Sequence, residues 1–140
     1  MDLRLLVIIV SGVFAVGTLA AAWRSRSWLM MDLTDFKVDF ARTIVVADKV
    51  QPALAVIAIG AIAAYVLGSS EQGEGFAIGA GLILLSTILV SLAILVPLQR
   101  RIINKSESNA VTDALRSRWI RGHAIRTGAA VAAFSLATLV

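Results

Sequence analysis

Four long apolar segments constrain the fold of this 140-residue chain more than any other feature. They are Leu3–Trp23, Pro52–Gly68, Gly75–Pro97 and Trp119–Val140. Each is close to the roughly 20 apolar residues that cross a hydrocarbon core about 30 Å thick. No segment alternates like a strand, and only helices or closed barrels satisfy backbone polar groups in lipid. Because four segments are too few to close a barrel, we predict an all-α membrane protein, a four-transmembrane-helix bundle forming one integral domain over residues 1–140.

Composition narrows the possible cofactors and partners. The chain is 59% hydrophobic, and it has no cysteine and a single histidine. It therefore lacks disulfides and thiolate ligands, and it has too few imidazoles for a protein-only zinc or copper site. We predict no cofactor, with a haem or a quinone inside the bundle left open. The net charge of +4 is also found in nucleic-acid-binding proteins, but here the basic residues flank apolar segments. We therefore predict membrane lipids as partners, and no nucleic acid.

The basic residues predict the topology. Twelve of the thirteen Lys and Arg residues, counting Arg126, lie on one side of the predicted spans, and only Arg4 lies on the other. The short connection Ser69–Glu74 contains no basic residue. By the positive-inside rule, both long connections are cytoplasmic and both termini lie outside. We predict an integral protein of the plasma (inner) membrane.

The first apolar segment has an alternative interpretation as a signal peptide. Ala20–Ala22 resembles a small-residue cleavage site. The residues before it are only weakly basic, with Asp2 beside Arg4, and Arg24 follows the apolar run almost at once. That charge pattern is typical of a span whose N-terminus lies outside, so we predict a retained helix.

Residues 34–50 keep a helical pattern between the first two spans. Phe36, Phe40 and Ile44 fall on one stripe, and most of the charged residues fall off it. We predict an amphipathic cytoplasmic helix. It either lies on the membrane surface or continues into the second span, with Pro52 near the junction.

Small residues recur at intervals of four, which allows helix backbones to approach closely. We expect these series to form packing faces within the bundle or, in a homo-oligomer, between protomers. They are Gly17 and Ala21; Gly60, Ala64 and Gly68; Gly75 and Gly79; Gly128 and Ala132.

The start of the fourth apolar segment contains the candidate functional residues. Trp119, His123 and Arg126 are spaced i, i+4, i+7 and share one helix face. Arg126 would lie about 9 Å inside the hydrocarbon core. Ionisable side chains inside a membrane are functional candidates unless they snorkel to the interface. At this depth both interpretations stay open: an interfacial anchor, or a site that binds a hydrophobic or aromatic molecule or a lipid.

A buried guanidinium needs a hydrogen-bond acceptor. The nearest carboxylates are Asp48 at the start of the second span and then Asp39 on its cytoplasmic approach. We prefer an Asp48–Arg126 pair, with an anionic or phenolic ligand as the alternative. At the end of the third span, Pro97 is expected to bend or end the helix. Gln99, which follows it, is a candidate to hydrogen-bond inward, and the alternative is a plain helix terminus with basic flanks. The candidate ligand-binding residues are therefore Trp119, Gln99, Asp48 and Asp39, with His123 and Arg126 as candidate catalytic residues.

Three short stretches resemble, in the right order, motifs of the anthrone-oxygenase-like family of small membrane proteins. They are Val50-Gln51-Pro52-Ala53, Val96-Pro97-Leu98-Gln99-Arg100-Arg101-Ile102, and Arg118-Trp119 through His123 to Arg126-Thr127. The third is the most specific and resembles the pattern Trp-x-x-x-His-x-x-Arg-[Ser/Thr]. In the second, Gln99 stands where asparagine is usual and Ile102 where leucine is usual, which puts in doubt any role that needs the shorter amide.

The resemblance implies a four-helix membrane bundle. For some relatives it also implies oxidation of polyketide anthrones to anthraquinones by molecular oxygen, without metal or flavin. It implies His123 as the base, Arg126 as the partner of the oxyanion, and Trp119 stacking on the flat substrate. Two functions stay open: binding of a hydrophobic or aromatic ligand or lipid without catalysis and, as the alternative, cofactor-independent anthrone-type oxygenation.

Two other small membrane-protein classes do not fit. A small multidrug exporter needs a carboxylate embedded in its first helix, and residues 5–23 contain none. A glutathione-using eicosanoid-type enzyme needs Glu, Arg and Asn within its second span, and residues 53–68 have none of them.

Overall fold

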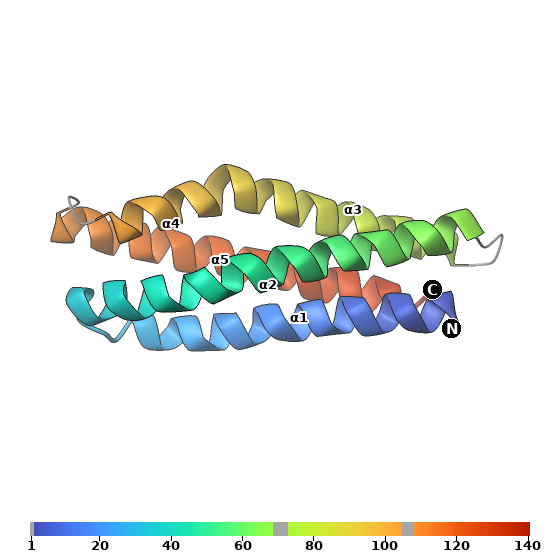
Figure 1. The fold of residues 1–140 in the computed structure, drawn as a ribbon, viewed down its shortest axis with the longest axis horizontal. Helices are drawn as coiled ribbons and strands as arrows, with labels where there is room; N and C mark the ends of the chain where they lie inside the picture. The colour runs from blue at the N-terminus through green and yellow to red at the C-terminus, as the bar shows by residue number, and fades with distance from the viewer. Residues whose placement is uncertain (1, 69–72, 105–107) are drawn as a thin grey trace.

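The protein is a bundle of four helical columns. The computed structural model describes residues 2–68, 73–104 and 108–140, and every regular element in these ranges is a helix. The elements are α1 (Leu3–Trp28), α2 (Leu33–Gly68), α3 (Glu74–Val90), the π-helical turn η1 (Ser91–Leu95), α4 (Val96–Ile103) and α5 (Asn109–Ala137). Because α3, η1 and α4 follow one another without a break, they form a single column beside α1, α2 and α5 (Figure 1). Most of the predicted Ser69–Glu74 connection, and Lys105 of the second basic loop, lie outside the described residues.

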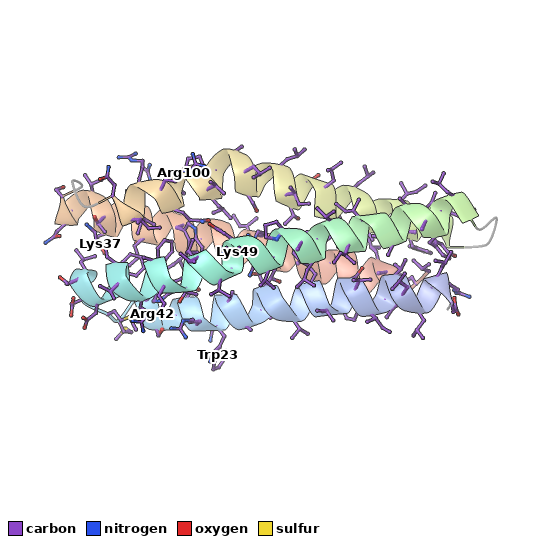
Figure 2. The ribbon with its side chains drawn as sticks, viewed as in Figure 1. Trp23, Lys37, Arg42, Lys49 and Arg100 are labelled. Carbon is purple, nitrogen blue, oxygen red and sulfur yellow. The ribbon has the colours of Figure 1, made fainter. Side chains whose placement is uncertain are left out.

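The two ends of the bundle differ in composition. Both termini lie at one end, and the α1–α2 connection, the end of α4 and the start of α5 lie at the other (Figure 1). Figure 2 shows Lys37, Arg42 and Arg100 toward this second end, which we call the charged end. At the opposite end, Arg4 Nε donates a hydrogen bond of 2.9 Å to the carbonyl of Val140. The arrangement fits an even number of crossings, while the side of the membrane on which each end lies stays a prediction.

Three of the four columns have the length and apolar character of membrane spans. These are α1, α2 and the α3–η1–α4 column, so the prediction of a helical membrane protein is confirmed to this extent. Among the described helices, α5 is long enough but not apolar enough to count as a span, because its first half contains Arg121, His123 and Arg126. Its 29 residues nevertheless extend about 43 Å, and α5 packs against both α1 and α3. A fourth span therefore stays a prediction.

Helix α2 is continuous from the charged end into the second predicted span. It starts after Asp32, whose carboxylate accepts the backbone N–H groups of Thr34 and Asp35 at 2.8 and 3.0 Å, as an N-cap does. It then runs 36 residues to Gly68 with Pro52 inside it. Residues 34–50 thus belong to the same helix as the second predicted span, while their position relative to the membrane surface stays a prediction. At about 54 Å, α2 is longer than the hydrocarbon core is thick.

The core has two halves of different character. Alanines from three columns fill the half nearer the termini: Ala55, Ala58, Ala61, Ala77, Ala80, Ala130, Ala133 and Ala137. Aromatic side chains fill the half at the charged end: Trp28, Phe36, Phe40 and Trp119. Small side chains let helices approach closely in a membrane, where burial of apolar surface gives little driving force. The half of the core nearer the termini contains most of the predicted apolar spans, and it is this half that is packed with alanine.

The glycine series contribute less to this packing than expected. A Cβ added at Gly17, Gly60, Gly75 or Gly128 would meet nothing within 4 Å, whereas one at Gly79 would lie 3.3 Å from Leu136. Alanines, and not most of the predicted glycines, therefore form the contacts between helices. A role for the open glycines between protomers stays a prediction.

The third column changes register by one residue at η1. The buried residues of α3 are spaced by three, four and three: Ala77, Ala80, Leu84 and Thr87. Continued along a regular helix, this pattern would reach positions 91, 94, 98 and 101. The buried residues that follow lie one position later than the last three of these: Leu95, Gln99 and Ile102. The wide π turn holds the extra residue. Pro97, expected to bend or end the helix, stands just after this turn, and the helix continues to Ile103. The shift turns Gln99 inward.

Candidate functional site

A polar layer separates the alanine half of the core from the aromatic half. It consists of Asp48 and Gln51 from α2, Gln99 from α4, and His123 and Arg126 from α5. The helical spacing predicted for α5 brings His123 and Arg126 to the same face, beside Trp119. The register shift at η1 supplies Gln99. The layer thus collects side chains from three columns.

Gln99 is the hub of the hydrogen bonds in this layer. Its Nε2 donates to Asp48 Oδ1 and Oδ2 at 3.0 and 3.1 Å, and its Oε1 accepts from Trp119 Nε1 at 3.4 Å. Gln99 is 5% exposed, whereas Asp48 lies at the exposed edge of the layer. The Gln99 side chain therefore joins α2, α4 and α5. A shorter asparagine would not reach both partners from this backbone position.

Trp119 is enclosed on all sides and does not have a free face for a substrate. His123 stacks on it with ring centroids 4.9 Å apart and an interplanar angle of 9°. Phe40 meets it edge-on at 5.0 Å, and Trp28 lies against it at 5.6 Å. The role implied by the resemblance, stacking on a flat substrate, does not fit this arrangement. Trp119 instead fixes the plane of the His123 ring.

His123 is buried, and its ring has no side-chain partner. It is 1% exposed, neither imidazole nitrogen forms a hydrogen bond of normal geometry with a described residue, and the backbone of Thr18 is the polar group close to the ring. The backbone around it is held by Thr127, whose hydroxyl donates to the carbonyls of His123 and Thr18 at 2.9 and 3.3 Å. Buried polar atoms are nearly always paired. An unpaired imidazole in the core is therefore available to a ligand, to a water molecule or to a proton.

A small cavity lies against the His123 ring. Its volume is about 20 Å³, and Gln51, Gln99 and Arg126 are among the residues that line it. A cavity of at least about 10–15 Å³ with polar walls holds one water molecule. The space beside His123 thus fits one water and no larger ligand.

Arg126 reaches across the bundle from α5 to α2. Its Nη2 donates to the side-chain oxygen of Gln51, and its buried Nε has no partner. The predicted pair with Asp48 is not formed as a direct contact, because Asp48 accepts Gln99 and Gln51 lies one helical turn deeper along α2. Gln51 is not among the predicted site residues, although two signals point to it: it belongs to the family-like stretch Val50-Gln51-Pro52-Ala53, and it stands one turn from Asp48 on the same helix.

Asp39 lies outside the polar layer. Its carboxylate accepts Trp28 Nε1 at 2.6 Å and Arg24 Nη2 at 2.7 Å. The hydrogen bond from Trp28, and next the bond and charge of Arg24, lower the pKa of Asp39 against the opposing effect of partial burial. The candidate ligand-binding role is not supported by this placement. Asp39 fastens α1 to α2 at the charged end.

A larger cleft opens between α2 and η1, and we call it the α2–η1 cleft. It has a volume of about 140 Å³, close to the roughly 150 Å³ cavity that binds benzene in another protein. Four polar-layer residues form one wall, Asp48, Gln51, Gln99 and Arg126, and most of the other lining residues are apolar. The same four residues line the small cavity beside His123. The cleft and the imidazole are therefore separated by one layer of side chains.

A family model described as anthrone oxygenase matches residues 40–136. The chain belongs to this family. The match includes the whole polar layer of this anthrone oxygenase family member and leaves α1 outside. Comparisons with curated proteins and with solved structures gave no match. The family is described as cofactor-independent, and the described residues contain no group of three or more His, Asp and Glu that could hold a metal ion.

Proposed function

We propose that this protein oxidises a flat phenolic ketone of the anthrone type with molecular oxygen and without a cofactor. The substrate reacts at the α2–η1 cleft, which encloses about one ring while the rest of the fused ring system extends through its open side. The observation that carries the proposal is the buried imidazole of His123, whose nitrogens form no hydrogen bond with any described side chain, one side-chain layer behind that cleft. Membership of the anthrone oxygenase family supports the reaction class. Each residue of the polar layer that takes part in the reaction then has its own role.

His123 acts as the base. The methylene group of an anthrone is acidic because its conjugate base spreads charge onto the ketone oxygen. The small cavity has room for one water between His123 and the cleft, and a general base works through one such water. Arg126 stands between the two spaces with an unused Nε–H, so it stabilises the oxyanion that forms.

The oxidation then needs only molecular oxygen. The anion transfers electrons to dioxygen and a carbon–oxygen bond forms. The resulting peroxide anion takes back the proton held by His123 and becomes a hydroperoxide. Loss of the second methylene proton and cleavage of the oxygen–oxygen bond release water and leave the new carbonyl. Anthrone and dioxygen thus give anthraquinone and water, with one oxygen atom in each product. The chain supplies positioning and charge, and the substrate supplies the electrons.

A second candidate function is binding without catalysis. The water-sized cavity beside His123 and the enclosed Trp119 also suit a layer that joins α2, α4 and α5 and holds a hydrophobic or aromatic ligand or a lipid in the α2–η1 cleft. In that case the protein binds an anthraquinone but does not consume oxygen.

Turnover of 1,8-dihydroxyanthrone by the purified protein in nanodiscs tests the proposal. Oxygen uptake and anthraquinone absorbance are measured after subtraction of the protein-free rate. We expect His123→Phe, which keeps the stacking on Trp119, and Arg126→Gln to lose about 100-fold or more in rate. Arg121→Gln, an exposed position on the same helix, is the matched control. Parent-like rates in folded His123→Phe protein would refute the catalytic role, and anthraquinone binding by a parent without turnover would favour the second candidate.

We also propose that α5 is the fourth span, with both termini outside and the charged end in the cytoplasm. Support comes from its length, its packing along α1 and α3, and the shared end of the termini. The chain has no cysteine, so single cysteines introduced at Asp2 and Arg118 report their side directly through a membrane-impermeant maleimide. Labelling of position 118 from outside intact cells would reverse the proposed orientation.

A further inference from the structure

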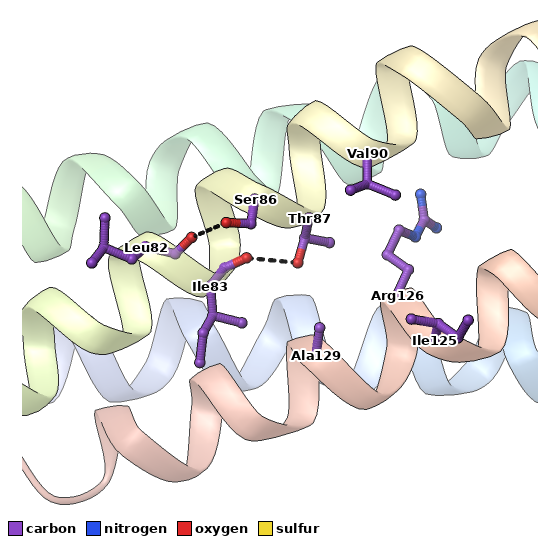
Figure 3. A pocket seen from close by; sticks show the side chains of 8 residues that line it. All are labelled: Leu82, Ile83, Ser86, Thr87, Val90, Ile125, Arg126 and Ala129. Atoms are coloured by element: carbon purple, nitrogen blue, oxygen red, sulfur yellow. Dashed lines mark hydrogen bonds between the residues drawn. The ribbon is translucent and has the colours of Figure 1, made fainter.

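Arg126 also lines a second cleft, which opens between α3 and α5. This α3–α5 cleft has a volume of about 280 Å³. Figure 3 shows Arg126 rising from α5 toward Val90 at one end of the cleft, while Leu82 and Ile83 of α3 lie toward the other. The Arg126 side chain therefore lines both clefts and the small cavity beside His123.

The walls of the α3–α5 cleft offer a ligand almost no polar partner. The hydroxyls of Ser86 and Thr87 donate to carbonyls of their own helix, at 2.8 and 2.7 Å (Figure 3). Among the described lining residues, Arg126 is left as the one with an unused buried donor, its Nε. A molecule that fits the cleft is therefore apolar along its length and has an oxygen at the Arg126 end.

The cleft opens toward the lipid. Leu82 and Ile125, at its rim, are 60% and 74% exposed. Leu82 belongs to a column that is apolar enough to cross the membrane, so its exposed side chain meets acyl chains and not water. The volume is about twice that of the benzene-binding cavity, which suits two or three fused rings.

We propose that the α3–α5 cleft takes flat polycyclic phenols and quinones directly from the bilayer, with their oxygen held by Arg126. The passage from this cleft to the other rests on the proposed function. When Arg126 swings away from Gln51, its one hydrogen-bond partner on α2, the two clefts join and the molecule reaches the α2–η1 cleft. Such molecules concentrate in lipid, and their carbonyl or phenolate oxygen complements the guanidinium. A lipid acyl chain would contact the same apolar walls, but it has no oxygen to accept a hydrogen bond from Arg126.

The test narrows the α3–α5 cleft from either wall. Ala129→Leu adds bulk from α5 and Ser86→Leu adds it from α3. Ala132→Leu, at an exposed position of α5 one turn further on, is the matched control. Each protein is reconstituted in phosphatidylcholine nanodiscs, its folding is checked by thermal unfolding, and binding of 1,8-dihydroxyanthraquinone is followed by its absorbance. Turnover of the corresponding anthrone is measured in parallel.

We expect both cleft variants to raise the Kd for the anthraquinone about tenfold and to lower kcat/KM for the anthrone with little change in kcat. Ala132→Leu should match the parent. Parent-like binding in both cleft variants would overturn the inference, and the proposed function would survive if turnover persists. If the parent shows no turnover but binds the anthraquinone more tightly than the two cleft variants do, the result would support the binding cleft and contradict the proposed oxygenase activity. A parent whose cleft retains only phospholipid, with no anthraquinone bound, would also overturn the inference.

Discussion

Gly122 and Gly128 lie on the same helix, yet a methyl group at the two positions meets different surroundings. A Cβ at Gly122 would lie 2.7 Å from Cδ2 of Leu95, and one at Gly128 would meet nothing within 4 Å. Ordinary carbon contacts are about 3.5–4.0 Å, so the contact at Gly122 would be short by about 1 Å. Leu95 is 1% exposed and has little space into which to move. The substitution therefore forces the buried Leu95 side chain out of its position or pushes η1 away from α5.

The free energies follow from these contacts. Glycine to alanine inside a helix stabilises by about 1 kcal/mol, and we expect Gly128→Ala to show this gain. Forcing a methyl group into a filled core costs about 1–3 kcal/mol, which cancels or reverses the gain at Gly122. The two variants should therefore differ by about 1–3 kcal/mol in the free energy of unfolding. Because the same contact positions the turn before Gln99, Gly122→Ala should also slow anthrone turnover while Gly128→Ala does not.

Equilibrium unfolding in mild detergent, followed by far-ultraviolet circular dichroism, measures the difference. Introducing Leu95→Ala into both backgrounds completes the test, because contacting residues show a coupling of about 0.5 kcal/mol or more and distant ones do not. We expect coupling of Leu95→Ala with Gly122→Ala and none with Gly128→Ala. Equal unfolding free energies for the two alanine variants would refute the close packing of η1 on α5.

Two further predictions concern the hydrogen bonds at the charged end and in the polar layer. The pKa of Asp39 is lowered in the folded protein, chiefly by Trp28, so its stabilisation is present above the unfolded pKa of about 3.9 and is lost as the pH falls through the folded value. Asp39→Asn should therefore lose less thermal stability between pH 6 and pH 3 than the parent, and parallel losses would contradict this. Gln99→Leu leaves the indole N–H of Trp119 without its acceptor and should cost about 1–3 kcal/mol; an unchanged free energy of unfolding would show that this bond is not formed.

The apolar segments predicted the helices well, since burial in lipid permits few alternatives for runs of that length. The extent of α2 was not predictable in the same way, because Pro52 is compatible with both a helix break and a continuous helix. Its continuity depends on Phe36, Phe40 and Ile44 finding the aromatic half of the core. Contacts between residues that are far apart in the sequence cannot be predicted from the pattern of neighbouring residues.

The candidate site was predicted in part. The helical spacing of α5 placed His123 and Arg126 together, because both stand on one regular helix. The acceptor of Arg126 was a different matter, since it depends on the relative depth of α2 and α5, and Gln51 proved nearer than Asp48. The surroundings of Trp119 depend on Trp28 and Phe40 from two other columns, which no spacing within α5 reveals.

Because η1 contains an extra residue, the number of residues in the third column determines which side chain faces the polar layer. If the same sequence formed an uninterrupted α-helix, the α3 pattern would bring Leu98 inward and turn Gln99 away by roughly 100°. Deletion of Ala93 would remove the need for the wide turn, because Gln99 would then fall on the inward position of a regular helix. Homologues with one residue fewer between Thr87 and Gln99 can therefore keep the same polar layer. Those with a regular helix of the present length must place their amide one position earlier, so an alignment of this column has to count turns as well as residues.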